Sequence, residues 1–302
     1  TNSRVAVNGS NVDPGSGSWG VSVITLTVPA AATNNGVIQA TRSDLKTSNN
    51  SAAFYVLPKI TSTGPTSAEA RESDAITITG NHFCGTCTNL PTIRFYNASQ
   101  TVDATANSGA SATSLAVTVP TTLTDTIDSY NLEVVRSAAG GQDDGKSSTN
   151  TTRNNFAYTI LPKISSITNC NKSGFPAGAF AREYNAGDAA CPNNLTDGAV
   201  VINGDHFGGA GSVSVLGGAA TQAAVTGFCS GSAYTATCIA AQLTAANISD
   251  STYTGNLVVT RTSDSKPDTL TGFRVLPRIN SLSSTSGTEN DSITVIGNHL
   301  CQ

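Results

Sequence analysis

Residues 76–85 have the sequence ITITGNHFCG, which predicts a β-strand followed by a turn. Its first half alternates Ile with Thr, which is the period of a strand with one buried face, and β-branched residues suit a pleated surface. Its second half begins with Gly-Asn, a pair that favours a turn. Related phrases occupy residues 200–209 (VVINGDHFGG) and 293–302 (ITVIGNHLCQ). The sequence therefore predicts a repeated β unit.

A proline phrase opens each copy of this unit. The three prolines stand 104 and 115 residues apart: Pro58 in FYVLPKITS, Pro162 in AYTILPKISS and Pro277 in FRVLPRINS. Before each proline, beyond a polar loop, lies a strand-like segment that ends in arginine: Arg42 in IQATRS, Arg136 in LEVVRS and Arg261 in LVVTRT. Proline fits the first residue of an edge strand or a crossing between domains, so its recurrence marks domain joints.

The joints divide the chain into four parts. Residues 58–161 and 162–276 each form a complete unit, the second with an inserted loop, whereas 1–57 has only the later strands and 277–302 only the opening ones. Six or seven short strands per roughly 100 residues indicate a sandwich of immunoglobulin type. We expect an all-β fold of tandem immunoglobulin-like sandwiches arranged in a linear string.

These phrases resemble a known family. A unit that opens with LPKI-S and continues to ITITGNHF is similar to the IPT/TIG domains, which are immunoglobulin-like units of bacterial surface proteins, plexin-type receptors and some transcription factors. The resemblance covers essentially the whole chain, in two complete and two partial copies. It implies an immunoglobulin-like fold and a modular, often extracellular setting.

The two partial units are complementary. GNHLCQ followed by TNSRVAV parallels GNHFCGTCTNLPTIRF, so 277–302 and 1–57 together make one unit. Either the chain is a window of a longer tandem array, or 277–302 of one molecule completes 1–57 of the next, which would generate an open head-to-tail filament. The expected interface comprises Pro277, Ile279, Ile293, Val295, Gly297, Leu300, Val5, Val7, Val23 and Leu26.

The amino-acid composition argues against some classes of partner and indicates a cellular compartment. Charged residues are 12% of the chain and the net charge is -4 without a basic cluster, which argues against nucleic acid as a partner. No apolar stretch approaches the roughly 20 residues of a membrane-spanning helix, and the absence of Met and of a signal segment fits a processed or excerpted chain. Seven cysteines favour an oxidising compartment, so an extracellular or cell-surface location is expected.

The cysteines suggest local disulfides. In HFCGTC we favour a bond between Cys84 and Cys87, with a metal site at His82, Cys84 and Cys87 as the alternative. The other expected pairs are Cys170 with Cys191, which brackets the inserted loop, and Cys229 with Cys238. Cys301 is left over and is a candidate for an intermolecular bond.

The remaining polar motifs favour structure over chemistry. His82, His206 and His299 each stand two residues after the same strand-ending glycine, and we expect packing or turn residues rather than metal ligands. The acidic clusters near Asp144, Asp250 and Asp264 are expected to be solvated turns, with calcium binding between domains as the alternative. With no nucleophile elbow, phosphate loop or Ser/His/Asp set, we expect neither an enzyme nor a bound cofactor. The Asn-x-Ser/Thr sites are candidate glycan acceptors: Asn8, Asn49, Asn97, Asn150, Asn171, Asn194, Asn247 and Asn290.

The leading hypothesis is an extracellular structural protein, a subunit or segment of a cell-surface filament, fibre or stalk whose main partner is itself. The alternative is an adhesin or receptor ectodomain that binds a surface ligand or glycan, with the inserted loop around Phe175, Phe180 and Tyr184 as its patch.

Overall fold

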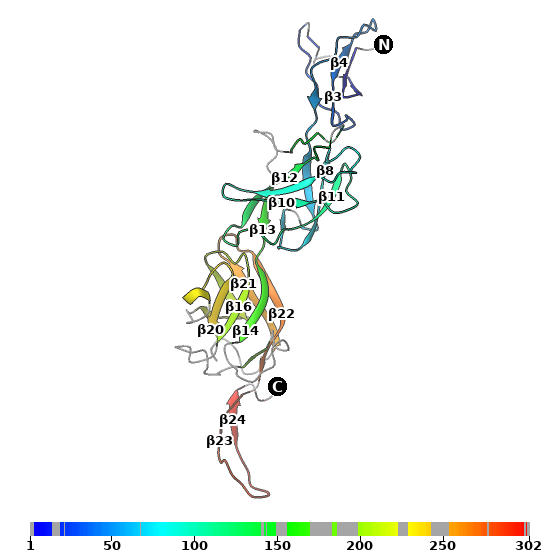
Figure 1. Ribbon diagram of the computed structural model, residues 1–302. Coiled ribbons are helices and arrows are strands. Elements are labelled where there is room, and N and C mark those ends of the chain that lie inside the picture. The colour runs from blue at the N-terminus through cyan, green and yellow to red at the C-terminus, as the bar shows by residue number, and fades with distance from the viewer. Residues whose placement is uncertain are drawn as a thin grey trace. The chain divides into compact units, whose positions relative to one another are not determined.

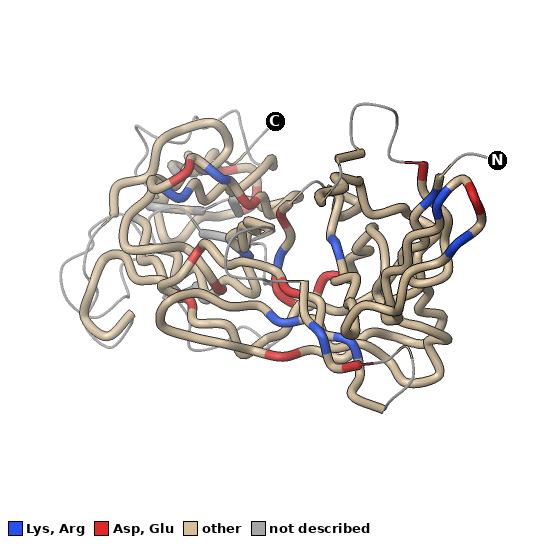
Figure 2. The backbone as a smooth tube through the Cα atoms, turned by 90° about the horizontal axis from the view of Figure 1, so that it is seen from above, with Lys and Arg blue, Asp and Glu red and all other residues tan. Residues whose placement is uncertain are grey.

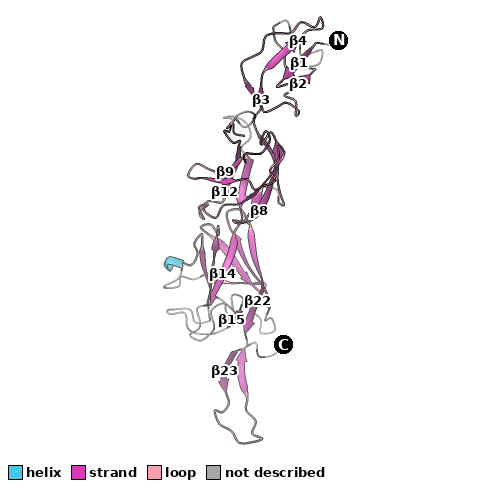
Figure 3. Ribbon diagram, turned by 45° about the vertical axis from the view of Figure 1, so that its right-hand side comes forward, coloured by secondary structure: helices cyan, strands magenta, loops and turns pink. Residues whose placement is uncertain are grey.

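The structure is a computed structural model of the 302-residue chain. It describes residues 3–13, 19–20, 22–66, 68–139, 142, 144–148, 156–169, 183–185, 199–222, 229–242, 254–276, 278–298 and 300. The chain forms two compact units, one made of Thr1–Leu123 with Ser129–Thr159 and the other of Thr124–Asp128 with Ile160–Gln302. Figure 1 labels the strands, and Figure 3 shows strands throughout, with one short 3₁₀ turn, Cys229–Gly231, among the described residues.

Residues 58–161 fold into a two-layered sandwich. Its strands are β6 (Lys59–Gly64), β7 (Glu69–Ala70), β8 (Ala75–Asn81), β9 (Thr92–Tyr96), β10 (Thr101–Thr105), β11 (Ser114–Thr118), β12 (Ser129–Val135) and β13 (Phe156–Ile160). One sheet has the order β11-β8-β6 and the other β10-β9-β12-β13-β7. The Ile-Thr alternation places Ile76 and Ile78 of β8 in the core and leaves Thr77 and Thr79 exposed.

Residues 162–276 repeat this plan. Their strands are β14 (Lys163–Asn169), β15 (Glu183–Asn185), β16 (Ala199–Asp205), β17 (Gly211–Val215), β18 (Gly218–Ala219), β19 (Thr221–Gln222), β20 (Cys238–Gln242), β21 (Thr254–Arg261) and β22 (Pro267–Leu276). The two sheets have the orders β14-β16-β20-β19 and β15-β22-β21-β17-β18. Phe207 and Phe273 are fully buried between them with the aliphatic residues of β16 and β21. The predicted all-β sandwich architecture is confirmed.

The partial repeats contain subsets of the same strands. Residues 1–57 form β1 (Arg4–Val7), β2 (Ser10–Val12), β3 (Asn35–Gly36), β4 (Ile38–Thr41) and β5 (Phe54–Tyr55), and 277–302 form β23 (Arg278–Leu282) and β24 (Val295–Asn298). β1 pairs with β4 as β9 pairs with β12, and β23 pairs with β24 as β6 pairs with β8. In the described residues, 1–57 has no counterpart of β6 or β8.

Charge is distributed sparsely. Figure 2 shows lysines, arginines and acidic residues interspersed along the described chain, in keeping with the net charge of -4. Within the described residues, no helix is long and apolar enough to span a membrane.

Candidate functional site

A buried arginine joins residues of two successive repeats. The Arg136 side chain, at the end of β12, is 0% exposed. Its Nε and Nη2 donate to the two carboxylate oxygens of Asp144 at 2.8 and 3.0 Å. Its Nη1 donates to the main-chain carbonyls of Val56 at 2.8 Å and His82 at 3.0 Å. Val56 precedes Pro58 and His82 follows β8, so one guanidinium ties the end of one repeat to the next. We call this arrangement the arginine clamp.

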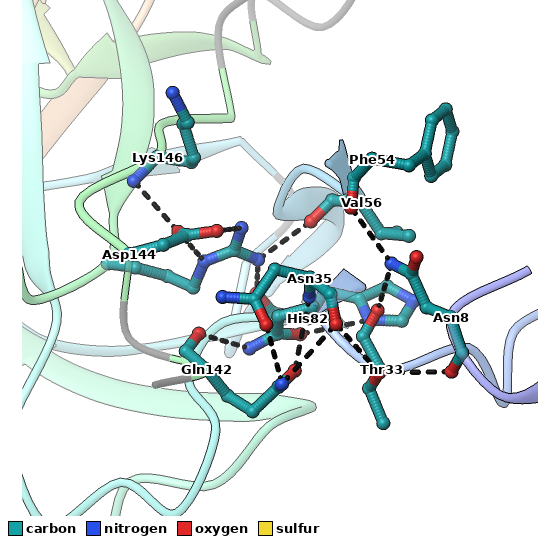
Figure 4. Close-up of polar contacts among 11 residues, drawn as sticks. Asn8, Thr33, Asn35, Phe54, Val56, His82, Gln142, Asp144 and Lys146 are labelled. Atoms are coloured by element: carbon teal, nitrogen blue, oxygen red, sulfur yellow. Dashed lines mark hydrogen bonds and ion pairs between the residues drawn. The ribbon is translucent and has the colours of Figure 1, made fainter. Parts of the chain in front are cut away.

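A polar shell surrounds this clamp. Figure 4 shows Asn35, His82 and Gln142 meeting beside Val56 and Asp144. The Gln142 amide nitrogen donates to Asn35 Oδ1 at 2.7 Å, and Asn34 donates to the Gln142 carbonyl at 3.0 Å. The Lys146 ammonium lies 4.5 Å from the centre of the Tyr55 ring, within the range of a cation–π contact. The joint therefore combines a buried charge pair with side-chain contacts from both repeats.

The same clamp occurs in the second unit around Arg261. This side chain is also 0% exposed, and its Nε and Nη2 donate to Asp264 at 3.0 and 2.7 Å. Its remaining bonds reach the carbonyls of His206 at 2.8 Å and Ile160 at 2.9 Å, and Asp128 Oδ1 at 2.7 Å. Ile160 stands two residues before Pro162, as Val56 stands two before Pro58. The clamp is thus a repeated device.

The clamp acids were expected to lie in solvated turns. This expectation is wrong for Asp144, whereas Asp264 does lie in an exposed turn. The Asp144 side chain is 8% exposed and that of Asp264 is 27% exposed, because each closes a tight loop against its arginine. The loop also positions the acid, since Lys146 N donates to Asp144 and Lys266 N to Asp264. Hydrogen bonds from Arg261 lower the pKa of Asp264 and keep it ionised.

The repeated histidines supply main-chain carbonyls. His82 and His206 have positive φ values of 62° and 56°, and this backbone turn accompanies the presentation of their carbonyls to Arg136 and Arg261. Burial lowers the pKa of both imidazoles, with the neighbouring arginine adding to the effect at His82. The His82 ring contacts Asn34 Oδ1 at 3.2 Å and the His206 ring contacts the Ile127 carbonyl at 3.2 Å. His299 lies outside the described residues.

The two partial repeats expose positions that the complete repeat buries. Ile60 is 6% exposed, whereas its counterpart Ile279 is 60% exposed; Ile78 is 0% exposed, whereas its counterpart Val295 is 44% exposed. On the side of 1–57, Val28 is 40% exposed while its counterpart Val119 is fully buried. In the complete repeat these positions lie between two sheets, β11-β8-β6 and β10-β9-β12-β13-β7. The described residues of 1–57 contain no counterpart of β6 or β8 to complete such a pair of sheets.

The structure treats the expected interface residues differently. Ile279, Ile293, Val295 and Leu300 are exposed on 277–302, and Val23 is exposed on 1–57. Leu26 is partly buried. Val5 and Val7 were expected at the interface but lie already covered, because Trp19, Ile24 and Leu26 pack against their cluster. Gly297 belongs to β24, and Pro277 lies outside the described residues.

Two expected cysteine pairs are disulfides. Cys84 is bonded to Cys87 and Cys229 to Cys238, with Cα atoms 5.1 Å apart in each pair. The bonded sulfurs of Cys84 and Cys87 are unavailable as thiolate ligands beside His82. Cys170, Cys191 and Cys301 lie outside the described residues, as do Phe175 and Phe180 of the inserted loop. Tyr184 lies in β15, paired with Val275 of β22.

The candidate glycan acceptors separate by exposure. Asn49 and Asn290 are exposed and Asn97 is half-buried. Asn8 is unsuited to a glycan in the folded chain, because it is 4% exposed and its amide nitrogen donates to the carbonyls of Thr33 and Phe54. Its sequon occurs in a turn between β1 and β2, where the side chain turns inward. Asn150, Asn171, Asn194 and Asn247 lie outside the described residues.

Sequence reasoning missed the role of the arginines. Their recurrence was visible, and so was an Asp two residues before a Lys in the following loop: Asp44 and Lys46, Asp144 and Lys146, Asp264 and Lys266. The carbonyl acceptors left no signal, because a main-chain oxygen is the same in every residue.

Comparison with known proteins assigns no family. No family model matches the chain, and no curated protein does. Among solved structures, it is similar to a protein of unknown function from Bacteroides thetaiotaomicron VPI-5482, with 14% identity, 72% of this chain and 50% of that chain covered and a TM-score of 0.28. A plexin A4 extracellular region matches with 11% identity, 87% and 35% coverage and a TM-score of 0.25. The chain spans about half or less of these structures' lengths.

Proposed function

We propose that this chain is an extracellular structural protein, part of a cell-surface filament, fibre or stalk. In this proposal, 277–302 of one molecule completes the partial sandwich 1–57 of a second copy. One observation carries it: apolar positions exposed on both partial repeats are core positions in the complete repeat. The disulfides and the resemblance to IPT/TIG domains support the extracellular setting.

The complete repeat supplies the register of this contact. There β11 pairs with β8 so that Val117 faces Ile76, Ala116 faces Thr77 and Leu115 faces Ile78. The matching residues in the partial repeats are Leu26 with Ile293, Thr25 with Thr294, and Ile24 with Val295. In the composite domain we expect these three pairs to form an antiparallel ladder.

Burial provides the driving force. Each Val, Leu or Ile that moves from water into a core contributes about 1.5–3 kcal/mol of stability. Five exposed apolar residues of 277–302 correspond to buried residues of the complete repeat: Ile279, Leu282, Ile293, Val295 and Leu300. Pairing also satisfies strand edges that otherwise attract unwanted partners. Because the contact joins two different surfaces, it propagates into a filament.

A disulfide trap tests the contact. Thr25 and Thr294 are exposed, and so are their counterparts Ala116 and Thr77, which form a cross-strand pair on the outer face of the complete repeat. In a Cys301→Ser background, molecules carrying Thr25→Cys are mixed with molecules carrying Thr294→Cys under mild oxidation. We expect a disulfide-linked species at twice 30.6 kDa on a non-reducing gel.

Thr27→Cys mixed with Thr294→Cys is the matched control. It moves the thiol two residues along the same exposed face, beyond the reach of a disulfide in the expected register. Equal trapping of both pairs, or trapping of neither, would contradict the proposal. Electron microscopy of the unmodified chain gives a second readout, since linear filaments are expected and discrete monomers are not. Native material that migrates as one very large band in a reducing denaturing gel would instead indicate a continuous array.

A further inference from the structure

We propose that Arg42 is the intermolecular copy of the arginine clamp, and that its acceptor is the Val275 carbonyl of a second copy of the chain. This inference rests on the proposed function and names a contact that holds the composite domain to the domain before it. It makes Arg42 a determinant of assembly, with no role in the fold of the single chain.

The loop around Arg42 has the same local geometry as the two complete clamps. Its Nε and Nη2 donate to the two carboxylate oxygens of Asp44, at 3.3 and 2.8 Å. Asp44 also accepts a bond from Lys46 N at 3.2 Å, as Asp144 does from Lys146 and Asp264 from Lys266. The amide of each arginine donates to the carbonyl of the same lysine, at 2.9 to 3.0 Å.

Only the tertiary partners differ. The Arg42 side chain is 71% exposed, against 0% for Arg136 and Arg261. Within the described residues, Arg42 donates from Nε and Nη2 to Asp44, and no bond leaves its Nη1. In the Arg136 clamp, Nη1 is the atom that holds both main-chain carbonyls. Arg42 is thus a clamp with its acid in place and its carbonyl acceptors missing.

Sequence position identifies the main-chain carbonyl that would accept a hydrogen bond from Arg42. The clamp carbonyl stands two residues before the repeat proline, at Val56 and Ile160, and the third proline is Pro277. The corresponding residue is Val275, whose backbone lies in β22. Val275 belongs to the molecule that donates 277–302.

The consequence is a contact that forms only on assembly. An exposed Arg–Asp pair contributes little, at most about 1 kcal/mol, because water screens it. When docking removes the water, the guanidinium gains a charge-assisted bond to a main-chain carbonyl, and such bonds are roughly twice as strong as neutral ones. The bidentate contact with Asp44 holds the guanidinium ready, so little side-chain freedom is lost on docking.

The test compares two arginines of the same partial repeat. Arg42→Leu removes the clamp, Arg42→Lys keeps the charge without the planar fork, and Arg4→Leu removes a charge at an exposed position of β1. Light scattering of the full-length chain gives the lowest concentration at which filaments form. We expect Arg42→Leu to raise that concentration at least tenfold, Arg42→Lys to have an intermediate effect, and Arg4→Leu to stay within about twofold of the wild type.

Two readouts separate the clamp from the strand contact. The thermal unfolding of the unassembled Arg42→Leu chain should match that of the wild type, because Arg42 is exposed in the single molecule. The disulfide trap between residues 25 and 294 should still form in the Arg42→Leu background at raised concentration. Trapping together with an unchanged filament threshold in Arg42→Leu would overturn the clamp and leave strand complementation standing. Failure of the trap with Arg42 intact would overturn both.

Discussion

The arginine clamp shows how a single residue can set a domain joint. A buried guanidinium is costly unless its nitrogens find acceptors, and all three nitrogens of Arg136 do so, through four hydrogen bonds to one carboxylate and two carbonyls. Its acceptors come from residues 8, 54 and 80 positions away in the chain. Arg136 can therefore be buried only when these distant segments are packed together, and its hydrogen bonds in turn stabilise that packing.

Arg136→Leu should lower the free energy of unfolding by about 3–5 kcal/mol, because it leaves the Asp144 carboxylate and two carbonyls without their donor. Chemical denaturation of the unassembled chain measures this change. Asp103→Asn is the control: it removes an ion pair with Arg94 in which both side chains are substantially exposed, and its cost should be under about 1 kcal/mol. Equal costs for the two variants would show that the clamp contributes nothing beyond a surface ion pair.

His206 should make the second unit sensitive to acid. Burial lowers its pKa below the ordinary 6.5, an effect that outweighs Asp125 and Asp128, which raise it. The unfolded chain therefore binds a proton here at pH values where the folded chain does not, so stability is fully present above about pH 6.5 and falls as the pH drops toward the folded pKa. The slope should be up to about 1.4 kcal/mol per pH unit.

Urea denaturation between about pH 7 and pH 5 measures that slope. His206→Gln, which cannot titrate, should flatten it. An unchanged slope in His206→Gln would assign the acid sensitivity to other groups.

At the scale of elements, the opening strand pair recurs with the same register in three parts of the chain. The pairs β6 with β8, β14 with β16 and β23 with β24 share one register irregularity, between Ile60 and Ser62, Ile164 and Ser166, and Ile279 and Ser281. In each, the isoleucine before the irregularity faces a glycine: Gly80, Gly204 or Gly297. The 277–302 strand pair therefore has the same register as the corresponding pairs of the two complete repeats.

Gly204→Ala should lower the free energy of unfolding of the second unit by about 1–3 kcal/mol, because a Cβ there would overlap the Lys163 carbonyl and the Phe207 ring. Gly209→Ala is a close control, because a Cβ at that position meets nothing within 4 Å. Thermal unfolding of the two variants gives the comparison. Equal shifts of the unfolding midpoint in Gly204→Ala and Gly209→Ala would contradict the close packing assigned to Gly204.

At the scale of the whole molecule, two complete sandwiches are flanked by two incomplete ones. Apart from the isolated bridge between Trp19 and Ile24, residues 24–28 form no ladder in the described part of the chain, whereas their counterparts in β11 pair with β8. Residues 24–28 are therefore less protected than their counterparts in the complete repeat, and the proposed assembly should change their protection.

Hydrogen exchange should reveal this difference. Below the concentration at which filaments form, amides of residues 24–28 should exchange at least tenfold faster than those of residues 115–119. In filaments the two segments should be similarly protected. Strong protection of residues 24–28 in the dilute chain would contradict an open half-sandwich.

The sequence alone determined the repeat and the all-β fold, and it predicts that the two partial units are complementary. Each of these follows from the local periodicity of apolar residues or from the spacing of Gly, Pro and Arg. Both can be seen directly in the order of the amino acids. The two local disulfides were predictable for the same reason, because Cys84 and Cys87, and Cys229 and Cys238, are close in sequence.

Only the tertiary structure decided which of the recurring polar residues matter. The fold buries the Asp144 side chain, which had been expected in solvent, and turns the Asn8 side chain away from solvent. It also gave the arginines their partners and left Arg42 exposed. The physical reason is that the clamp acceptors are mostly main-chain carbonyls, which have the same chemistry at every position and acquire a role only when distant segments are brought within hydrogen-bonding distance.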